Sequence, residues 1–77
     1  MAMDLKQAAV LAVVELETKL LFDRDHNGAR TLTQTDWDGA SASVGAAGHL
    51  LPSAVCDALL FRIEGAERWL AARRAQG

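Results

Sequence analysis

A chain of 77 residues with one cysteine and a formal charge of −2 excludes a disulfide-stabilised fold and gives no basic surface for nucleic acid. So short a chain buries only about 60% of the surface that its unfolded form exposes, which predicts a marginal core. The longest apolar run near the N-terminus, residues 8–14, is far below the roughly 20 residues that cross a bilayer. We therefore expect a soluble, cytoplasmic protein that binds neither nucleic acid nor membrane.

The first predicted element is a helix over about residues 4–22. This segment contains no Gly or Pro, and its apolar residues recur every three or four positions, as on one face of a helix. A second apolar set projects from another side of the same helix and includes Val10, Val14 and Leu21. A helix with two apolar sides needs two partners, so we expect one side in the core and the other in a dimer contact. The spacing of the apolar residues does not show which side faces the core and which side faces the second copy.

Residues 23–35 form a predicted loop. The stretch LFDRDHNG, residues 21–28, resembles the first half of the calcium loop of the EF-hand family, in which oxygens at positions 1, 3 and 5 face the ion and Gly at position 6 makes a sharp turn. An ungapped count places Gln34 at position 12, where the family has a bidentate Glu, whereas two inserted residues would bring an Asp there. The resemblance covers about 15 residues and implies a calcium site formed by Asp23, Asp25, Asn27 and Asp36.

The residues of this loop also suit an ordinary turn between two helices. Asn27 and Gly28 are residue types that adopt the left-handed conformation at a helix end, and Asp and Thr residues cap the next helix. In this interpretation Asp23 and Asp25 are solvated turn residues. The turn needs fewer assumptions, and calcium binding is the alternative.

A short helix is predicted from about residue 36 to residue 48. Trp37, Ala40, Val44 and Ala47 recur there at helical intervals, after Thr and Asp residues suited to capping. Three glycines weaken this helix, each by about 1 kcal/mol relative to Ala. We expect a soft helix within the connection.

The last predicted helix covers about residues 52–74, with Pro in its first turn and two arginines in its last. Its main apolar seam, which includes Cys56, Leu59 and Ile63, alternates steps of four and three. A second seam with the same spacing is built mostly from small residues, which allow close approach of another helix in the core or in a dimer. Its members include Ala54, Ala58, Phe61 and Gly65.

One flank of this last helix carries the residues that we expect to bind a partner. Arg62, Trp69 and Arg73 lie at spacings of seven and four, and Trp and Arg are enriched in binding hot spots. The alternative is that Trp69 covers the edge of the core while the arginines lie solvated over it.

Cys56 belongs to the apolar seam, where a thiol packs as a small hydrophobe. Because no phosphate loop, serine elbow or zinc spacing accompanies it, we expect no enzymatic activity.

Together these patterns predict an all-α fold, with a single domain in which two long antiparallel helices are joined by a loop and a short third helix. The excess of apolar helix surface predicts a homodimer that forms a helical bundle. The expected function is that of a small interaction module, an adaptor or inhibitor of a larger bacterial host protein, encoded by a bacterium or a phage. The alternative is an EF-hand-like calcium-binding module. No cofactor other than calcium is expected.

Overall fold

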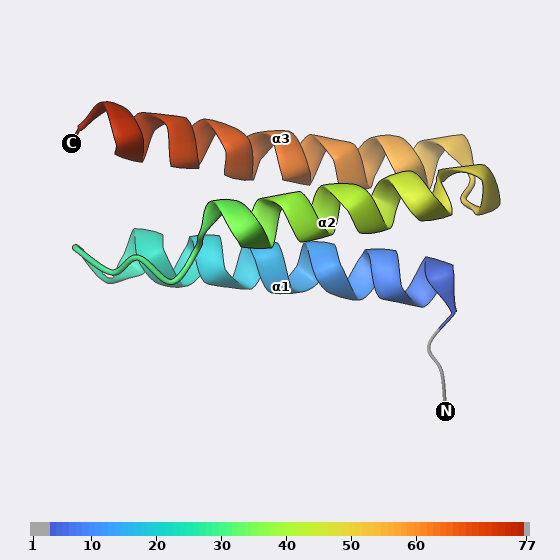
Figure 1. Cartoon of the computed structure of the whole chain (residues 1–77), viewed down its shortest axis with the longest axis horizontal. Coiled ribbons are helices and arrows are strands. Elements are labelled where there is room, and N and C mark those ends of the chain that lie inside the picture. The colour runs from blue at the N-terminus through green and yellow to red at the C-terminus, as the bar shows by residue number, and fades with distance from the viewer. Residues whose placement is uncertain (1–3, 77) are drawn as a thin grey trace.

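The computed structural model describes residues 4–76, which form three packed helices and one short 3-10 turn (Figure 1). The helices are α1 (Leu5–Asp25), α2 (Gln34–Ala47) and α3 (Ser53–Ala75), and η1 (Gly48–Leu50) follows α2 directly. Residues 4–76 contain no strand, so the predicted all-α fold is confirmed, and each helix boundary lies within three residues of its prediction. Across this part of the chain, none of the helices has both the length and the apolar character that crossing a membrane requires.

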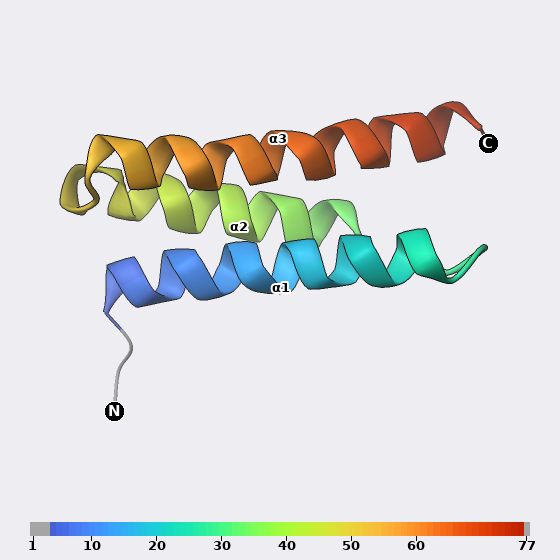
Figure 2. The ribbon, with the colours of Figure 1, turned by 180° about the vertical axis from the view of Figure 1, so that it is seen from behind.

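The two long helices run in the same direction, and α2 runs between them in the opposite one (Figures 1 and 2). The prediction of an antiparallel pair of long helices is therefore wrong. The sequence predicts the middle helix with nearly its observed length, but not that this helix packs against both long helices. In doing so its 14 residues, at a rise of 1.5 Å, carry the chain back by about 21 Å. The chain thus reverses twice between α1 and α3. All three pairs of helices are in contact.

The core lies where the three helices meet. On each helix the buried residues are three or four positions apart, as the sequence patterns predict. Leu32, in the loop before α2, is also fully buried. The indole N–H of Trp37 donates to the carbonyl of Ile63 at 3.1 Å and so fastens α2 to α3. The buried helical residues are Ala9, Val13, Leu16, Ala40, Val44, Ala47, Leu59, Ile63, Ala66 and Leu70.

The segment between α1 and α2 is a turn followed by a helix cap. Gly28 has a φ of 90°, a value that L side chains rarely adopt, and it reverses the chain after α1. The Thr33 hydroxyl accepts the N–H of Asp36 at 3.3 Å, while the Asp36 carboxylate accepts the N–H of Thr33 at 2.9 Å. This reciprocal capping box satisfies two backbone donors at the start of α2. The prediction that Gly turns this segment and that Thr and Asp cap the next helix is confirmed.

Candidate functional site

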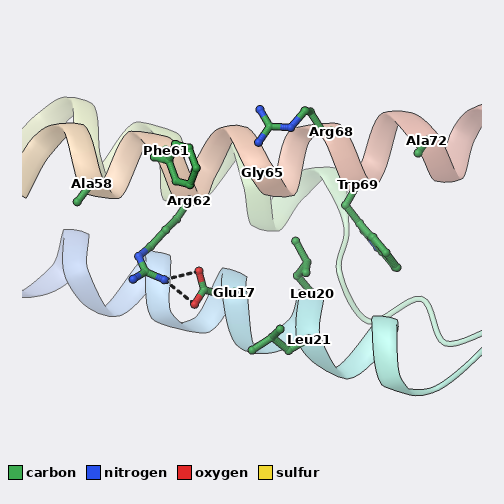
Figure 3. A pocket seen from close by; sticks show the side chains of 10 residues that line it. All are labelled: Glu17, Leu20, Leu21, Ala58, Phe61, Arg62, Gly65, Arg68, Trp69 and Ala72. Atoms are coloured by element: carbon green, nitrogen blue, oxygen red, sulfur yellow. Dashed lines mark hydrogen bonds and ion pairs between the residues drawn. The ribbon is translucent and has the colours of Figure 1, made fainter.

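An apolar groove runs between α1 and α3 (Figure 3). It lies on the face opposite α2, which is the face that Figure 2 turns toward the reader. Its main hollow has a volume of about 690 Å³. Residues of α1 form one wall and residues of α3 form the other. The lining residues are Glu17, Leu20, Leu21, Ala58, Phe61, Arg62, Gly65, Arg68, Trp69 and Ala72.

The hollow exists because α3 presents small residues along this wall. Ala58, Gly65 and Ala72 follow one another at steps of seven, so that small residues alternate with the larger Phe61 and Arg68 along this side of the helix. At Gly65 an added Cβ would meet only the Nη2 atom of Arg68, at 3.9 Å. The two helices therefore leave space here that their own side chains do not fill.

Phe61 stands at the edge of this hollow and is 68% exposed, more than any other large apolar side chain in residues 4–76. Moving such a side chain out of water is worth about 1.5–3 kcal/mol. On α1, Leu21 lines the same hollow, and Val10 and Val14 line a smaller one beside it. Val14 is 53% exposed. This face of the molecule therefore gains from being covered.

An ion pair joins the two walls of the groove. Arg62 Nη1 lies 2.6 Å from both carboxylate oxygens of Glu17 (Figure 3). Both side chains are partly exposed, so the pair contributes at most about 1 kcal/mol to stability. Its importance is positional, because Glu17 and Arg62 line both hollows and mark the boundary between them.

The three residues predicted as a partner-binding flank do not stay together. Arg62 and Trp69 line the groove, and the indole Nε1 of Trp69 is shielded from water without a hydrogen-bond partner among residues 4–76. Arg73 instead places its Nη1 atom 3.5 Å from Oδ2 of Asp23, with 21% of its side chain exposed. We therefore assign Arg62 and Trp69 to the groove and Arg73 to the support of the turn after α1.

The seven residues predicted as a dimer or core seam mostly gather on the groove face. Leu21, Ala58, Phe61 and Gly65 line the main hollow. As described above, Val10 and Val14 line the adjacent one. Ala54 is exposed one turn before Ala58 and lines neither hollow. The partner-binding flank and the dimer seam, which the sequence treats as two surfaces, thus largely form one.

Sequence reasoning missed Glu17 as a member of this site, whereas Arg68 falls on the small-residue seam predicted for the last helix. Glu17 lies three residues after Val14 and four before Leu21, so it continues the second apolar set of α1. Arg68 continues the small-residue seam of α3 with the same spacing. Glu17 could have been found by following the helical period of α1 through charged positions as well as apolar ones.

Asp23 is buried, with 4% of its surface exposed, so its interpretation as a solvated turn residue is wrong. Its carboxylate accepts the N–H of Thr31 at 2.9 Å, the hydroxyl of Thr31 at 2.5 Å and the N–H of Leu32 at 2.9 Å. Burial raises the pKa of Asp23, but these hydrogen bonds and the Arg73 charge outweigh burial and hold the pKa below its usual value. The side chain fixes the loop so that Leu32 enters the core.

The other predicted calcium ligands have separate surroundings. Asp36 accepts a hydrogen bond from Lys19 Nζ at 2.8 Å, and this contact, which exceeds the effect of burial, lowers the pKa of Asp36. Asp25 pairs with Arg24 at 3.3 Å on the surface, and Asn27 is exposed. Nowhere in residues 4–76 do three His, Cys, Asp or Glu side chains gather so that they could hold a metal ion. Calcium binding by this loop is the alternative hypothesis, and titration tests it.

Comparisons of the chain with protein-family models, with curated proteins and with solved structures found no match.

Proposed function

We propose that this protein is a small, non-enzymatic interaction module whose binding surface is the groove between α1 and α3. The observation that carries this proposal is the exposed Phe61 ring beside an apolar hollow on the same face. Contiguous apolar surface of this kind marks sites of protein association in soluble domains. Trp69 and Arg62 in the same groove belong to the residue types that dominate binding energies.

The module acts by covering a surface of another protein, as an adaptor or inhibitor of a larger bacterial or phage protein. The same groove serves a homodimer, since Leu21, Ala58, Phe61 and Gly65 all line it. One groove holds one occupant at a time. Self-association and binding of a larger partner therefore exclude each other, and the partner must displace the second copy.

Site-specific photo-crosslinking in the producing cell tests this proposal. A photoreactive amino acid replaces Phe61 in the groove in one variant and the exposed Ala46 on α2 in a control variant. We expect a defined adduct from position 61 and none from position 46, because only the first lies in the groove. Equal patterns from both positions, or no adduct from position 61, would contradict the proposal.

A second pair of variants shows whether the hollow itself is required. Gly65→Leu places a side chain in the hollow and also improves the helix, so the fold is retained. Gly45→Leu makes the same change on an exposed position of α2, outside the groove. We expect the first variant, combined with the crosslinker at position 61, to lose the adduct and the second to keep it. Retention of the adduct by Gly65→Leu would place the contact outside the hollow.

A further inference from the structure

We propose that the groove is covered by the groove face of a second copy of this chain, with the two α3 helices packed antiparallel about a twofold axis. This inference rests on the proposed function, since it names the occupant of the same surface. Three features of the described residues support it: shape, charge and area.

The shape of α3 is complementary to itself. Phe61 projects from the helix, and Gly65, one turn later, adjoins the hollow between the helices (Figure 3). A twofold axis perpendicular to α3 and placed between these two levels brings the Phe61 ring of each copy beside Gly65 of the other. An axis parallel to the helix would instead set Phe61 against Phe61. Reciprocal insertion therefore requires the antiparallel arrangement, in which each contact is made twice.

Two charged residues point to the same axis. Asp57 and Arg68 lie four residues before and seven residues after Phe61, so that all three share one side of α3. Both charged residues are exposed, and neither forms an ion pair within residues 4–76. Eleven residues of helix separate them by about 16 Å, too far for a contact within one copy.

A twofold axis at the level of residues 62 and 63, midway between the two charges, sets Asp57 of each copy opposite Arg68 of the other. The same axis places Phe61 next to Gly65. Shape and charge, which are independent features of the helix, thus select one arrangement. The contact gains two ion pairs and two buried phenylalanine rings, and it brings α3 of one copy close to the small-residue stripe of the other.

The outline of the molecule also leaves room for a stable interface. Seen from this side, the whole molecule extends over 38 by 26 Å, an outline of roughly 1,000 Å² of which the groove face is a part, and a standard stable interface buries about 800 Å² on each partner. The formal charge of −2 on each copy is small, so overall repulsion between copies is weak.

Charge exchange within α3, followed by sedimentation equilibrium, tests the arrangement. The wild-type chain should sediment with twice its mass of 8.2 kDa. Asp57→Arg and Arg68→Asp should each weaken dimerisation by about tenfold, since each creates two like-charge contacts. The double variant Asp57→Arg/Arg68→Asp restores both contacts and should return the dissociation constant to within about threefold of the wild type. Restoration can come only from contacts between copies, because the two positions cannot meet within one.

A second variant pair tests the insertion of the ring. Phe61→Glu should abolish the dimer across the accessible concentration range, whereas Leu60→Glu, on the same helix but outside both hollows, should leave dimerisation unchanged. Circular dichroism of each variant confirms that the helices remain folded, so that a loss of mass reports association.

The proposal is overturned if the wild-type chain sediments at 8.2 kDa up to several hundred micromolar, or if the double variant is as weak as the single ones. The outcomes separate it from the proposed function. A groove adduct with a different protein, together with a monomeric wild type, removes the second copy as occupant and keeps the interaction module. A restored dimer without any groove adduct to another protein supports the second copy alone.

Discussion

Replacing Asp23 by Ala should cost about 3 kcal/mol of folding free energy. The change removes a charged acceptor of three hydrogen bonds, leaves the buried N–H of Leu32 without a partner and takes the counter-charge from Arg73. Removing one member of a buried ion pair costs 3–5 kcal/mol. Because the molecule is only 18 Å across in its thinnest direction, water can approach the stranded groups after local relaxation, which places the cost at the lower end of that range.

The magnitude is large for a domain of this size, whose total stability by the usual value per residue is about 4–12 kcal/mol. Urea denaturation followed by circular dichroism measures it, at one fixed protein concentration, since self-association adds to apparent stability. Asp25→Ala, an exposed acid in the same turn, is the matched control and should change stability by less than about 0.5 kcal/mol. Asp23→Asn keeps one acceptor oxygen and should fall between the two.

Equal effects of Asp23→Ala and Asp25→Ala would refute the reasoning, because Asp23 is buried and accepts three hydrogen bonds, whereas Asp25 is exposed and pairs only with Arg24. An effect of Asp23→Ala that vanished in an Arg73→Leu background would reassign the cost to the stranded arginine alone. We expect instead that part of the cost remains, since the Thr31 and Leu32 donors still lack their acceptor.

Three further predictions concern the glycines, the acids and calcium. Gly28→Ala should destabilise the protein by about 1 kcal/mol, because a φ of 90° is unfavourable for a residue with a side chain. Gly45→Ala should stabilise the protein by up to about 1 kcal/mol, because Ala favours the helix and its methyl group meets no other atom. Thermal melting of both variants checks these opposite signs. Folding lowers the pKa values of Asp23 and Asp36. The stability that these two carboxylates contribute is therefore complete at pH values above the unfolded pKa of about 3.9, and it is lost as the pH falls through the pKa values of the folded protein. Urea midpoints should therefore drop more steeply in acid for the wild type than for Asp23→Asn/Asp36→Asn, and parallel curves would contradict this. Calorimetric titration with millimolar calcium should give no binding heat, since both acids already have partners, and a saturating heat that Asp25→Ala abolishes would restore the calcium hypothesis.

The helices and their inner faces follow from the amino-acid sequence alone. Leu59, Ile63 and Leu70 recur at steps of four and seven, and all three are buried. The Thr and Asp residues suited to helix capping likewise predict the start of α2 to within two residues. These features are predictable because helix formation, capping and the choice of an apolar face depend on residues within a few turns of one another.

The groove is predictable only in part. The sequence places Leu21 and Phe61 on the second seams of α1 and α3 without deciding between core and dimer contact, and both residues line the groove. That they belong to one surface with Trp69 depends on the parallel course of the two long helices. No local pattern encodes that direction, because it follows from the packing of α2 against both long helices, which carries the chain back along the bundle.

Tertiary structure alone decides the role of Asp23. Its neighbours in the chain favour a solvated turn, with a calcium loop as the alternative, and neither interpretation predicts a buried carboxylate. The outcome depends on Arg73, fifty residues later, and on the loop folding back so that Thr31 and Leu32 point their N–H groups at the carboxylate. Charge pairing and hydrogen bonding depend on separation in space, whereas the helical patterns of this chain depend on separation along the sequence.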